Sequence, residues 1–141
     1  MIDFDYYLAK EIVRRKSRDA NLAESLLNSA KDRFKFAVRI EEDRPRYALE
    51  LAYEAVRELL DALLSLRGYK TWSHEAAISF LMKLNTFGST EVERLNVSRM
   101  KRHSSKYYGA ILDLKEVEEE ITFLRGIFQK LVAIVEKELK T

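Results

Sequence analysis

Four basic side chains and a histidine occupy eight consecutive positions of this chain, and together they could bind a phosphate group. The cluster comprises Arg99, Lys101, Arg102, His103 and Lys106, and Tyr107 and Tyr108 follow it. On a helix, Arg99, His103 and Tyr107 share one face, whereas Arg102 and Lys106 form a second pair about 60° away. A guanidinium, an imidazole and a phenol could therefore converge on one phosphate. The alternative interpretation is a solvated basic helix end that complements the helix dipole.

Composition limits what the rest of the chain can do. The 141 residues suit one domain, 1–141, and the net charge of +2 is too small for a protein whose whole surface grips nucleic acid, so an anion site must be local. The chain has no cysteine and two histidines, so we predict no metal and no cofactor. No apolar run approaches the roughly 20 residues that span a bilayer, and we expect a cytoplasmic protein with no membrane contact.

The spacing of apolar residues predicts an all-α protein, an antiparallel up-and-down helical bundle with a short extra helix at the N-terminus. One proline and four glycines leave little room for turns, and we expect no strand. Pro45 suits the first turn of a helix, and Asp113 with Glu116 resembles a capping box. The predicted helices cover residues 2–16, 21–40, 45–67, about 73–84, 89 or 90 to near 109, and 113 onward.

Apolar stripes suggest which helix faces are buried. The first helix carries Phe4, Leu8 and Ile12 at steps of four residues. The stripe expected on the second helix comprises Leu22, Leu26, Ala30, Phe34 and Ala37. Gly126 within the last helix predicts a close contact with another helix, since glycine there costs about 1 kcal/mol relative to alanine.

The order of these helices and several short motifs resemble the HEPN superfamily (higher eukaryotes and prokaryotes nucleotide-binding). Residues 48–56, Ala-Leu-Glu-Leu-Ala-Tyr-Glu-Ala-Val, with residues 59–64 and Gly68, are similar to the second helix of that family. Ser73-His74 is similar to its entry into the next helix, and Arg102 with Tyr108-Gly109 resembles its motif. The resemblance covers about residues 20–139.

The resemblance implies a metal-independent endoribonuclease in which the ribose 2′-OH attacks the adjacent phosphate, a base accepts the proton, and arginine stabilises the developing charge. In this chain Tyr107 stands where the ribonucleases have histidine, and a phenol is a poor base at neutral pH. Whether the chain is an enzyme therefore stays open. The catalytic candidates are Arg102, His103 and Tyr107, and the candidates for binding phosphate or RNA are Arg99, Arg102, Lys106 and Tyr108.

Other residues carry weaker signals. Glu50, Glu54, Glu58 and Asp61 recur at helical steps, where solvent exposure is the default, although Glu54 could orient an arginine of the motif. His74, next to a helix cap, is more often a capping or packing residue than a ligand. The run 118–120 of three glutamates predicts a solvated face. Trp72 and the tyrosines could be core or interface residues, and they could also stack on RNA bases, although nothing in the sequence points to a site for this.

Three functions remain open from the sequence. The first is an RNA-binding or ribonuclease protein of toxin–antitoxin type, a homodimer whose two motifs line one cleft. The second is a catalytically silent HEPN module that binds a nucleotide or pairs with a small nucleotidyltransferase-domain protein. The third is a helical interaction protein with no role in nucleic-acid binding. Tyr107 favours the second, and His103 beside Arg99 favours the first.

Overall fold

The computed structural model describes the backbone of residues 1–107 and 113–141, and the side chains of residues 1–102 and 113–141. The prediction of an all-α bundle is confirmed. In the described part of the chain the elements are α1 (Phe4–Ala9), β1 (Val13–Arg15), α2 (Ala20–Ile40), α3 (Pro45–Arg67), β2 (Tyr69–Thr71), α4 (His74–Ser79), the 3₁₀ turn η1 (Phe80–Lys83), α5 (Ser89–Tyr107) and α6 (Leu114–Leu139).

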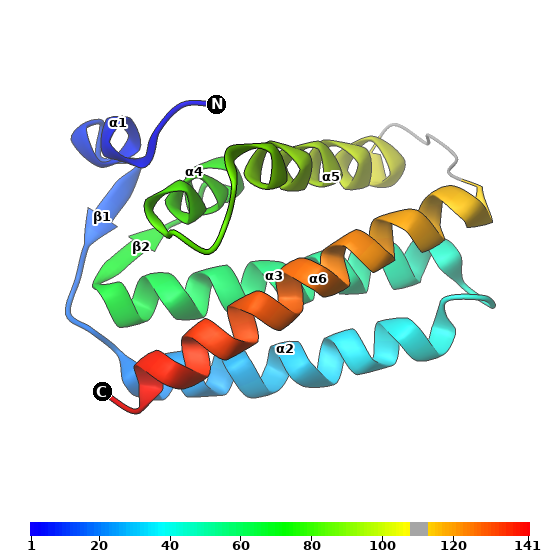
Figure 1. The fold of residues 1–141 in the computed structure, drawn as a ribbon, viewed down its shortest axis with the longest axis horizontal. Helices are drawn as coiled ribbons and strands as arrows, with labels where there is room; N and C mark the ends of the chain where they lie inside the picture. Colours follow the sequence, from blue (N-terminus) through cyan, green and yellow to red (C-terminus); the bar gives the residue numbers. More distant parts are fainter. Residues whose placement is uncertain (108–112) are drawn as a thin grey trace.

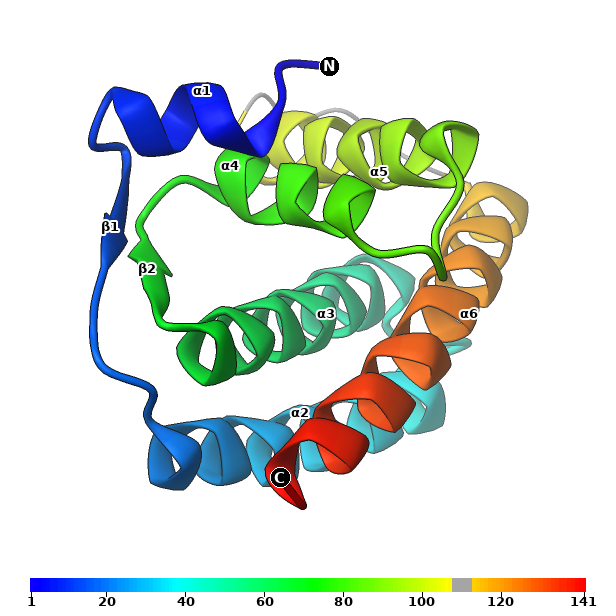
Figure 2. The same ribbon diagram turned by 60° about the vertical axis from the view of Figure 1, so that its left-hand side comes forward.

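The four long helices run alternately up and down (Figure 1). Helices α2 and α3 pack side by side as an antiparallel pair, and α6 lies obliquely across both of them. On the other side of α3, α4 and α5 form a second layer, which Figure 2 shows above α3. Helix α3 therefore contacts both α2 and α5, and it can bring side chains from those two helices into one site.

Small side chains let α2 and α3 approach closely. Ala48, Ala52 and Ala55 of α3 and Ala30 and Ala37 of α2 are fully buried. Alanine on both faces shortens the distance between helix axes and leaves room for larger residues further along the core.

The expected stripe on α2 was right at its C-terminal half and wrong at its start. The buried residues are Ala23, Leu27, Ala30, Phe34 and Ala37. Leu22 is 41% exposed, because the alternating steps of three and four keep Ala23 and Leu27, rather than Leu22 and Leu26, against α3.

The N-terminal segment differs from the prediction of one helix over residues 2–16 with no strand. Helix α1 ends at Ala9, and Glu11 adopts a positive φ of 59°. The chain then pairs as β1 with β2 in a short antiparallel ribbon, with Val13 opposite Thr71. Pairing with a strand almost sixty residues away overrides the local helical spacing, and Ile12 is 42% exposed as a result.

Polar caps and one glycine set the helix ends. Ser73 Oγ accepts a hydrogen bond from the backbone of Ala76, and Asp113 Oδ1 accepts one from Glu116, as the cap predictions required. Helix α3 ends at Gly68, whose φ is 81°. A Cβ atom at Gly68 would lie 2.9 Å from the carbonyl oxygen of Lys16, so both the backbone angle and the space require glycine.

Gly126 does not mark a close helix contact. It is exposed on α6, and a Cβ atom built there would meet no heavy atom within 4 Å. The prediction of a tight contact was wrong because position 126 lies on the face of α6 opposite the buried residues Leu124, Ile127 and Leu131.

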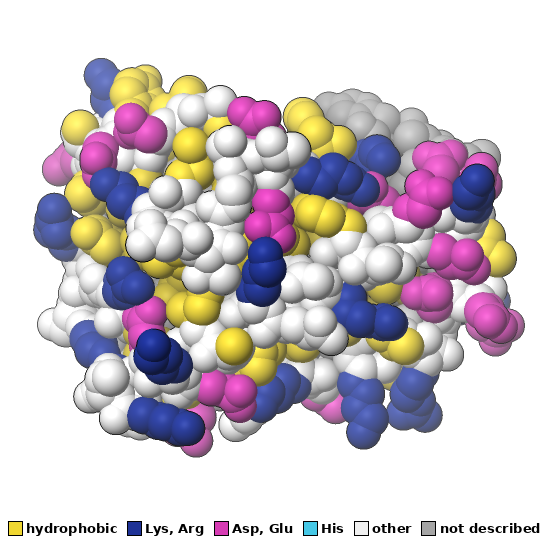
Figure 3. All heavy atoms as spheres, viewed as in Figure 1, with side chains coloured by type: hydrophobic (Ala, Val, Ile, Leu, Met, Phe, Trp, Pro, Cys, Tyr) yellow, Lys and Arg dark blue, Asp and Glu magenta, His cyan; other side chains and the backbone are white. Residues whose placement is uncertain are grey.

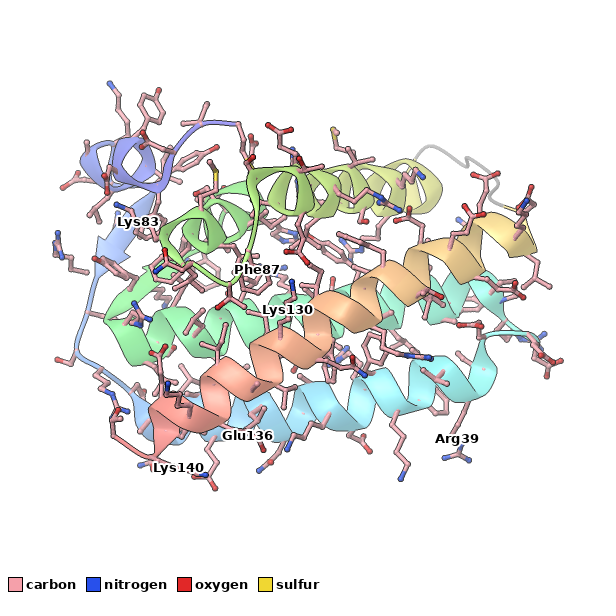
Figure 4. The ribbon with its side chains drawn as sticks, in the orientation of Figure 1. Arg39, Lys83, Phe87, Lys130, Glu136 and Lys140 are labelled. Carbon is pink, nitrogen blue, oxygen red and sulfur yellow. The ribbon has the colours of Figure 1, made fainter. Side chains whose placement is uncertain are left out.

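Lys130 of α6 contacts Phe87 in the loop before α5, and Figure 4 labels both side chains. Its Nζ atom donates to both carboxylate oxygens of Glu91, at 3.0 and 2.8 Å, and lies 5.3 Å from the centre of the Phe87 ring. This contact joins α6 to the first turn of α5. Over the face shown in Figure 3, acidic and basic side chains are interspersed, in agreement with the near-neutral net charge.

Candidate nucleic-acid interface

Arg102, the arginine of the motif, lies between α5 and α3. Its Nη2 atom forms an ion pair with Oε1 of Glu54, and its guanidinium carbon lies 5.3 Å from the centre of the Tyr53 ring. The side chain is 10% exposed, so the ion pair and the ring together fix the orientation of the guanidinium group. The expectation that Glu54 orients a motif arginine is confirmed.

The hydrogen bonding of Arg102 is incomplete. Its Nε atom is buried, and within the described parts of the chain it has no hydrogen-bond partner. A buried donor without a partner costs about 1–3 kcal/mol. Among the described residues, Arg102 is therefore anchored through Nη2, whereas its Nε has no acceptor.

A hollow of about 500 Å³ opens beside Arg102, between α2, α3 and the turn that joins them. Three arginines, two aromatic residues, two carboxylates and two aliphatic residues line it. They are Arg33, Phe36, Ile40, Arg44, Tyr47, Glu50, Leu51, Glu54 and Arg102. Phe36 is 48% exposed and Tyr47 is 60% exposed. We call this space the Arg102 hollow.

The arginines of the hollow differ in whether a carboxylate compensates their charge. Arg33 donates from Nε to Glu58 at 2.8 Å, and Glu58 also accepts a hydrogen bond from Ser29 at 2.6 Å. Arg44 donates to the backbone oxygen of Asp43 at 3.4 Å. Because a contact to a neutral carbonyl leaves the guanidinium charge uncompensated, Arg44 contributes more positive potential to the hollow than Arg33 does.

His74 and Tyr53 pack behind Arg102. Their rings are stacked with centres 6.2 Å apart, and Tyr53 Oη lies 3.5 Å from His74 Nδ1. Burial, together with the charges of Arg57, Arg102 and Arg99 and against that of Glu54, lowers the pKa of His74 to about 4. Burial also raises the pKa of Tyr53 to about 12. Both rings are therefore neutral at pH 7, and His74 is a packing residue, as expected.

Arg99 faces a different neighbour from Arg102. Its Nε atom donates to Asn96 Oδ1 at 2.8 Å, and its Nη2 atom lies 3.9 Å from a carboxylate oxygen of Glu75 in α4. The two arginines are three positions apart on α5, and the structure turns Arg102 toward α3 and the hollow but Arg99 toward α4. Of the predicted phosphate ligands, Arg102 lines the hollow and Arg99 does not.

The other predicted site residues lie where side chains are outside the described part of the structure. Helix α5 continues through Tyr107, so His103, Lys106 and Tyr107 belong to the same helix as Arg102. Tyr108 lies beyond the described residues.

Glu120 was placed on a solvated face with Glu118 and Glu119, and this was wrong. Its side chain is 1% exposed, and it accepts hydrogen bonds from Arg94, from Ser98 at 2.7 Å and from Lys101 at 3.1 Å. Burial alone would raise the pKa of Glu120, but the hydrogen bonds from these three residues outweigh it and hold the pKa below its usual range.

The Glu120 cluster has two consequences for the site. It takes Lys101 out of the predicted basic cluster, since this side chain is turned toward α6. It also fixes α5 against α6, and thereby the position of Arg102. The signal was present in the sequence, because position 120 lies in phase with the buried residues Val117, Ile121 and Leu124 of α6.

Among the described residues, no group of histidine and acidic side chains could hold a metal ion. No helix in that part of the chain combines the length and apolar character needed to cross a membrane. Comparison of the sequence with protein-family models and with curated proteins, and of the fold with solved structures, finds no match.

Proposed function

We propose that this chain binds single-stranded RNA or a nucleotide through the Arg102 hollow. The observation that carries the proposal is the convergence of Arg33, Arg44 and Arg102 on one hollow that also presents the exposed rings of Phe36 and Tyr47. Guanidinium groups donate two parallel hydrogen bonds to a phosphate, and aromatic rings stack on bases of any sequence. The resemblance to the HEPN superfamily points to the same class of ligand.

The donor groups of the hollow, rather than its net charge, favour an anion. Three arginines line it, although Glu58 outside the lining compensates Arg33, Glu54 compensates Arg102, and Glu50 is also among the lining residues. Glu54 neutralises part of Arg102 but also holds its guanidinium in place, so that a phosphate meets a preoriented donor. A phosphate at the guanidinium edge would also give Nε an acceptor, which no described residue provides.

Binding is the function that this geometry supports, and cleavage would need a base in addition. His74 is neutral at pH 7 but packs behind Arg102 and is not among the lining residues. The predicted base is His103, which shares a face of α5 with Arg99 rather than with Arg102, so cleavage in the hollow would require its side chain to reach across the helix toward Arg102. In that reaction the 2′ oxygen bonds to phosphorus, His103 accepts its proton, and the P–O5′ bond breaks as O5′ takes a proton from water, which leaves a 2′,3′-cyclic phosphate and a 5′-hydroxyl, with Arg102 stabilising the charge on the phosphoryl oxygens.

The ion pair between Arg102 and Glu54 favours one other candidate, the catalytically silent module. An arginine already committed to a carboxylate holds a ligand but has less charge to offer a transition state. In that case the hollow binds a nucleotide without cleaving it, and the partner is a protein with a nucleotidyltransferase domain.

The assembly proposed here is a homodimer formed through α5. Val97 is 38% exposed and Met100 is 46% exposed on this helix, beside the arginines of the motif. Two-fold pairing along this apolar strip would join the two α5 helices, with Arg102 about 140–160° around each helix from Val97 and Met100 and each hollow beside its own α3.

RNA binding tests the proposal directly. We would measure the fluorescence anisotropy of a dye-labelled ten-nucleotide uridylate with the wild type and with Arg102→Ala, Arg44→Ala and Arg39→Ala. Arg39 is the matched control. It is an exposed arginine at the C-terminal end of α2, where the hollow also lies, but its side chain points away from the bundle (Figure 4). We expect Arg102→Ala and Arg44→Ala to weaken binding about 5- to 100-fold and to reduce its salt dependence.

The same samples decide between the outcomes. Equal affinity of Arg102→Ala and Arg39→Ala would overturn the proposed site. Cleavage of the RNA in a chelator by the wild type and not by His103→Ala would assign the base, whereas binding without cleavage would favour the silent module.

A further inference from the structure

A second hollow, of about 310 Å³, lies at the opposite end of the α2–α3 pair. Three leucines form its apolar part, and cationic, polar and aromatic side chains surround them. The lining residues are Lys16, Leu22, Leu26, Arg57, Asp61, Leu64, Ser65, Tyr69, Lys70, Thr71 and Trp72. We call it the Trp72 hollow. Leu22, which the sequence placed in the core, is part of this surface instead, and Leu26 is partly buried against the core while it also lines the hollow.

Trp72 is the most exposed large apolar side chain in the described parts of the chain, at 80%. Its backbone is nevertheless held firmly. Thr71 Oγ1 donates to the carbonyl of Ile12 at 2.8 Å and accepts from the backbone N–H of Ser73 at 3.1 Å. Lys70 Nζ lies 4.7 Å from the Trp72 ring centre. The ring is thus presented to solvent from a fixed ribbon with a cation against it.

Asp61 supplies a polar group at the wall of the Trp72 hollow. It is partly buried, and it makes no hydrogen bond to another described residue. Burial raises its pKa to about 6, against the charge of Arg57. A partly buried carboxylate at the wall of the hollow can accept hydrogen bonds from the N–H groups on the edge of a base. Arg57 and Lys70, in the same lining, can donate to a phosphate.

The two hollows open on the same side of the α2–α3 pair. On α2, residues 22, 26, 29, 33, 36 and 40 follow one another at steps of three or four and share a face. On α3, residues 47, 50, 54, 58, 61 and 65 do the same, and the antiparallel packing sets the two faces beside each other. The stretch from Tyr47 to Ser65 is about 27 Å long at 1.5 Å per residue.

We propose that the Trp72 hollow receives a base of the same RNA strand whose phosphate binds in the Arg102 hollow, with the strand lying along the α2–α3 face. This inference rests on the proposed function, and it names the ligand as an RNA oligonucleotide rather than a mononucleotide. Arg33 lines the Arg102 hollow and Arg57 lines the Trp72 hollow, so each hollow has a cation on this face, although Arg33 is paired with Glu58. A strand at the duplex spacing of about 3.4 Å per nucleotide covers the distance with about eight nucleotides.

Trp72 is the single tryptophan of the chain, so its fluorescence reports on this hollow alone. We would titrate the protein with uridylates of two and of ten nucleotides and follow Trp72 emission and the anisotropy of labelled RNA in parallel. The matched control is Tyr6→Ala, since Tyr6 is 47% exposed with Lys10 Nζ 5.8 Å from its ring, but on α1. The variants compared are Trp72→Ala, Arg102→Ala and Tyr6→Ala.

With the wild type, the ten-nucleotide strand should quench Trp72 emission, and the RNA concentration at half-maximal quenching should equal that at half-maximal anisotropy change. This strand should also bind more tightly than the two-nucleotide one. Trp72→Ala should weaken binding of the longer strand at least fivefold, as stacking on one base is worth about 1–3 kcal/mol, while Tyr6→Ala leaves it unchanged.

Each contrary result has its own meaning. In one such result, Arg102→Ala weakens RNA binding, but RNA does not change Trp72 emission and Trp72→Ala binds as tightly as the wild type. This would overturn the inference and leave the proposed function standing. Quenching of the same strength in Arg102→Ala would show that the two hollows do not share a strand, which overturns it as well. A change of emission with protein concentration in the absence of RNA would assign the hollow to a second copy of the chain. No binding of the longer strand would overturn both proposals.

Discussion

Arg102 of α5 and Glu54 of α3 form an ion pair between residues 48 positions apart in the sequence, with side-chain exposures of 10% and 27%. The pair joins the layer of α4 and α5 to the α2–α3 pair at the wall of the Arg102 hollow. The same contact therefore serves the packing of the helices and the orientation of the site.

Replacing Glu54 should test the structural part of this role. Glu54→Gln keeps the shape but removes the charge that pairs with a nearly buried guanidinium, so we expect a loss of about 1–3 kcal/mol in the free energy of unfolding. Glu50→Gln, which removes the same charge from the same hollow, should stay within about 0.5 kcal/mol. Urea unfolding measures both, and a double variant with Arg102→Met should cost less than the sum of its single changes.

Glu120 should be more important for stability than its two glutamate neighbours. Glu120→Gln weakens the charge-assisted hydrogen bonds from Arg94, Ser98 and Lys101, and we expect it to cost about 2–3 kcal/mol at pH 7, against about 0.5 kcal/mol or less for the exposed Glu119→Gln. Because the pKa of Glu120 is lowered in the folded protein, its contribution is present above the ordinary value of 4.5 and is lost as the pH falls through the folded pKa. The difference between wild type and Glu120→Gln should shrink below pH 4.5, and equal slopes would contradict the assignment.

His74 should give the folded protein a sensitivity to mild acid. Its pKa falls from 6.5 to about 4 on folding, so the unfolded chain takes up a proton between these values and the folded protein does not. Stability is therefore complete above pH 6.5 and decreases as the pH falls toward 4. The raised pKa of Asp61 acts in the opposite direction over part of this range, so the readout is the difference between variants. Urea unfolding should show a flatter pH profile for His74→Asn than for wild type, and His103→Asn, at the other histidine, serves as the comparison.

Two glycines should respond to alanine with opposite signs. At Gly68, alanine would bring a Cβ atom to 2.9 Å from the Lys16 carbonyl at a φ of 81°, and we expect a loss of about 1–3 kcal/mol. At Gly126, inside α6 and free of neighbours, alanine should stabilise the protein by about 0.5–1 kcal/mol. Thermal unfolding of the two variants measures the contrast, and destabilisation by Gly126→Ala would mean that this position does contact another helix.

The proposed dimer through α5 can be broken at its apolar strip. Met100→Glu should convert a particle of twice 16.5 kDa into one of 16.5 kDa, because a carboxylate placed on each side of a two-fold contact repels its copy. Met82→Glu changes a methionine of similar exposure, 44%, on η1 and should leave the mass unchanged. Light scattering at micromolar concentration measures both variants, and a wild-type mass of 16.5 kDa would argue against the dimer.

Helix content, order and most helix ends could be predicted from local features of the chain. The caps at Ser73 and Asp113, the proline at the start of α3 and the glycine at its end act through neighbours in sequence, so the pattern alone reveals them. The sequence also named Glu54 as the carboxylate that could orient an arginine of residues 99–106, although solvent exposure was the default for Glu54, and in the structure it pairs with Arg102.

Tertiary contacts alone decided the rest. Val13 belongs to a strand because the segment at Tyr69–Thr71 offers it hydrogen bonds, and no residue near Val13 signals that partner. Leu22 and Trp72 are exposed because, among the described residues, none packs over the side of the α2–α3 pair on which the Trp72 hollow opens, whereas the end of α6 contacts the pair through Arg67 and Glu138. Glu120 is buried because α6 turns it toward three donors on α5. In each case the environment of the residue depends on groups far away in sequence. Helical periodicity shows only which residues share a face, and it does not show what that face will contact.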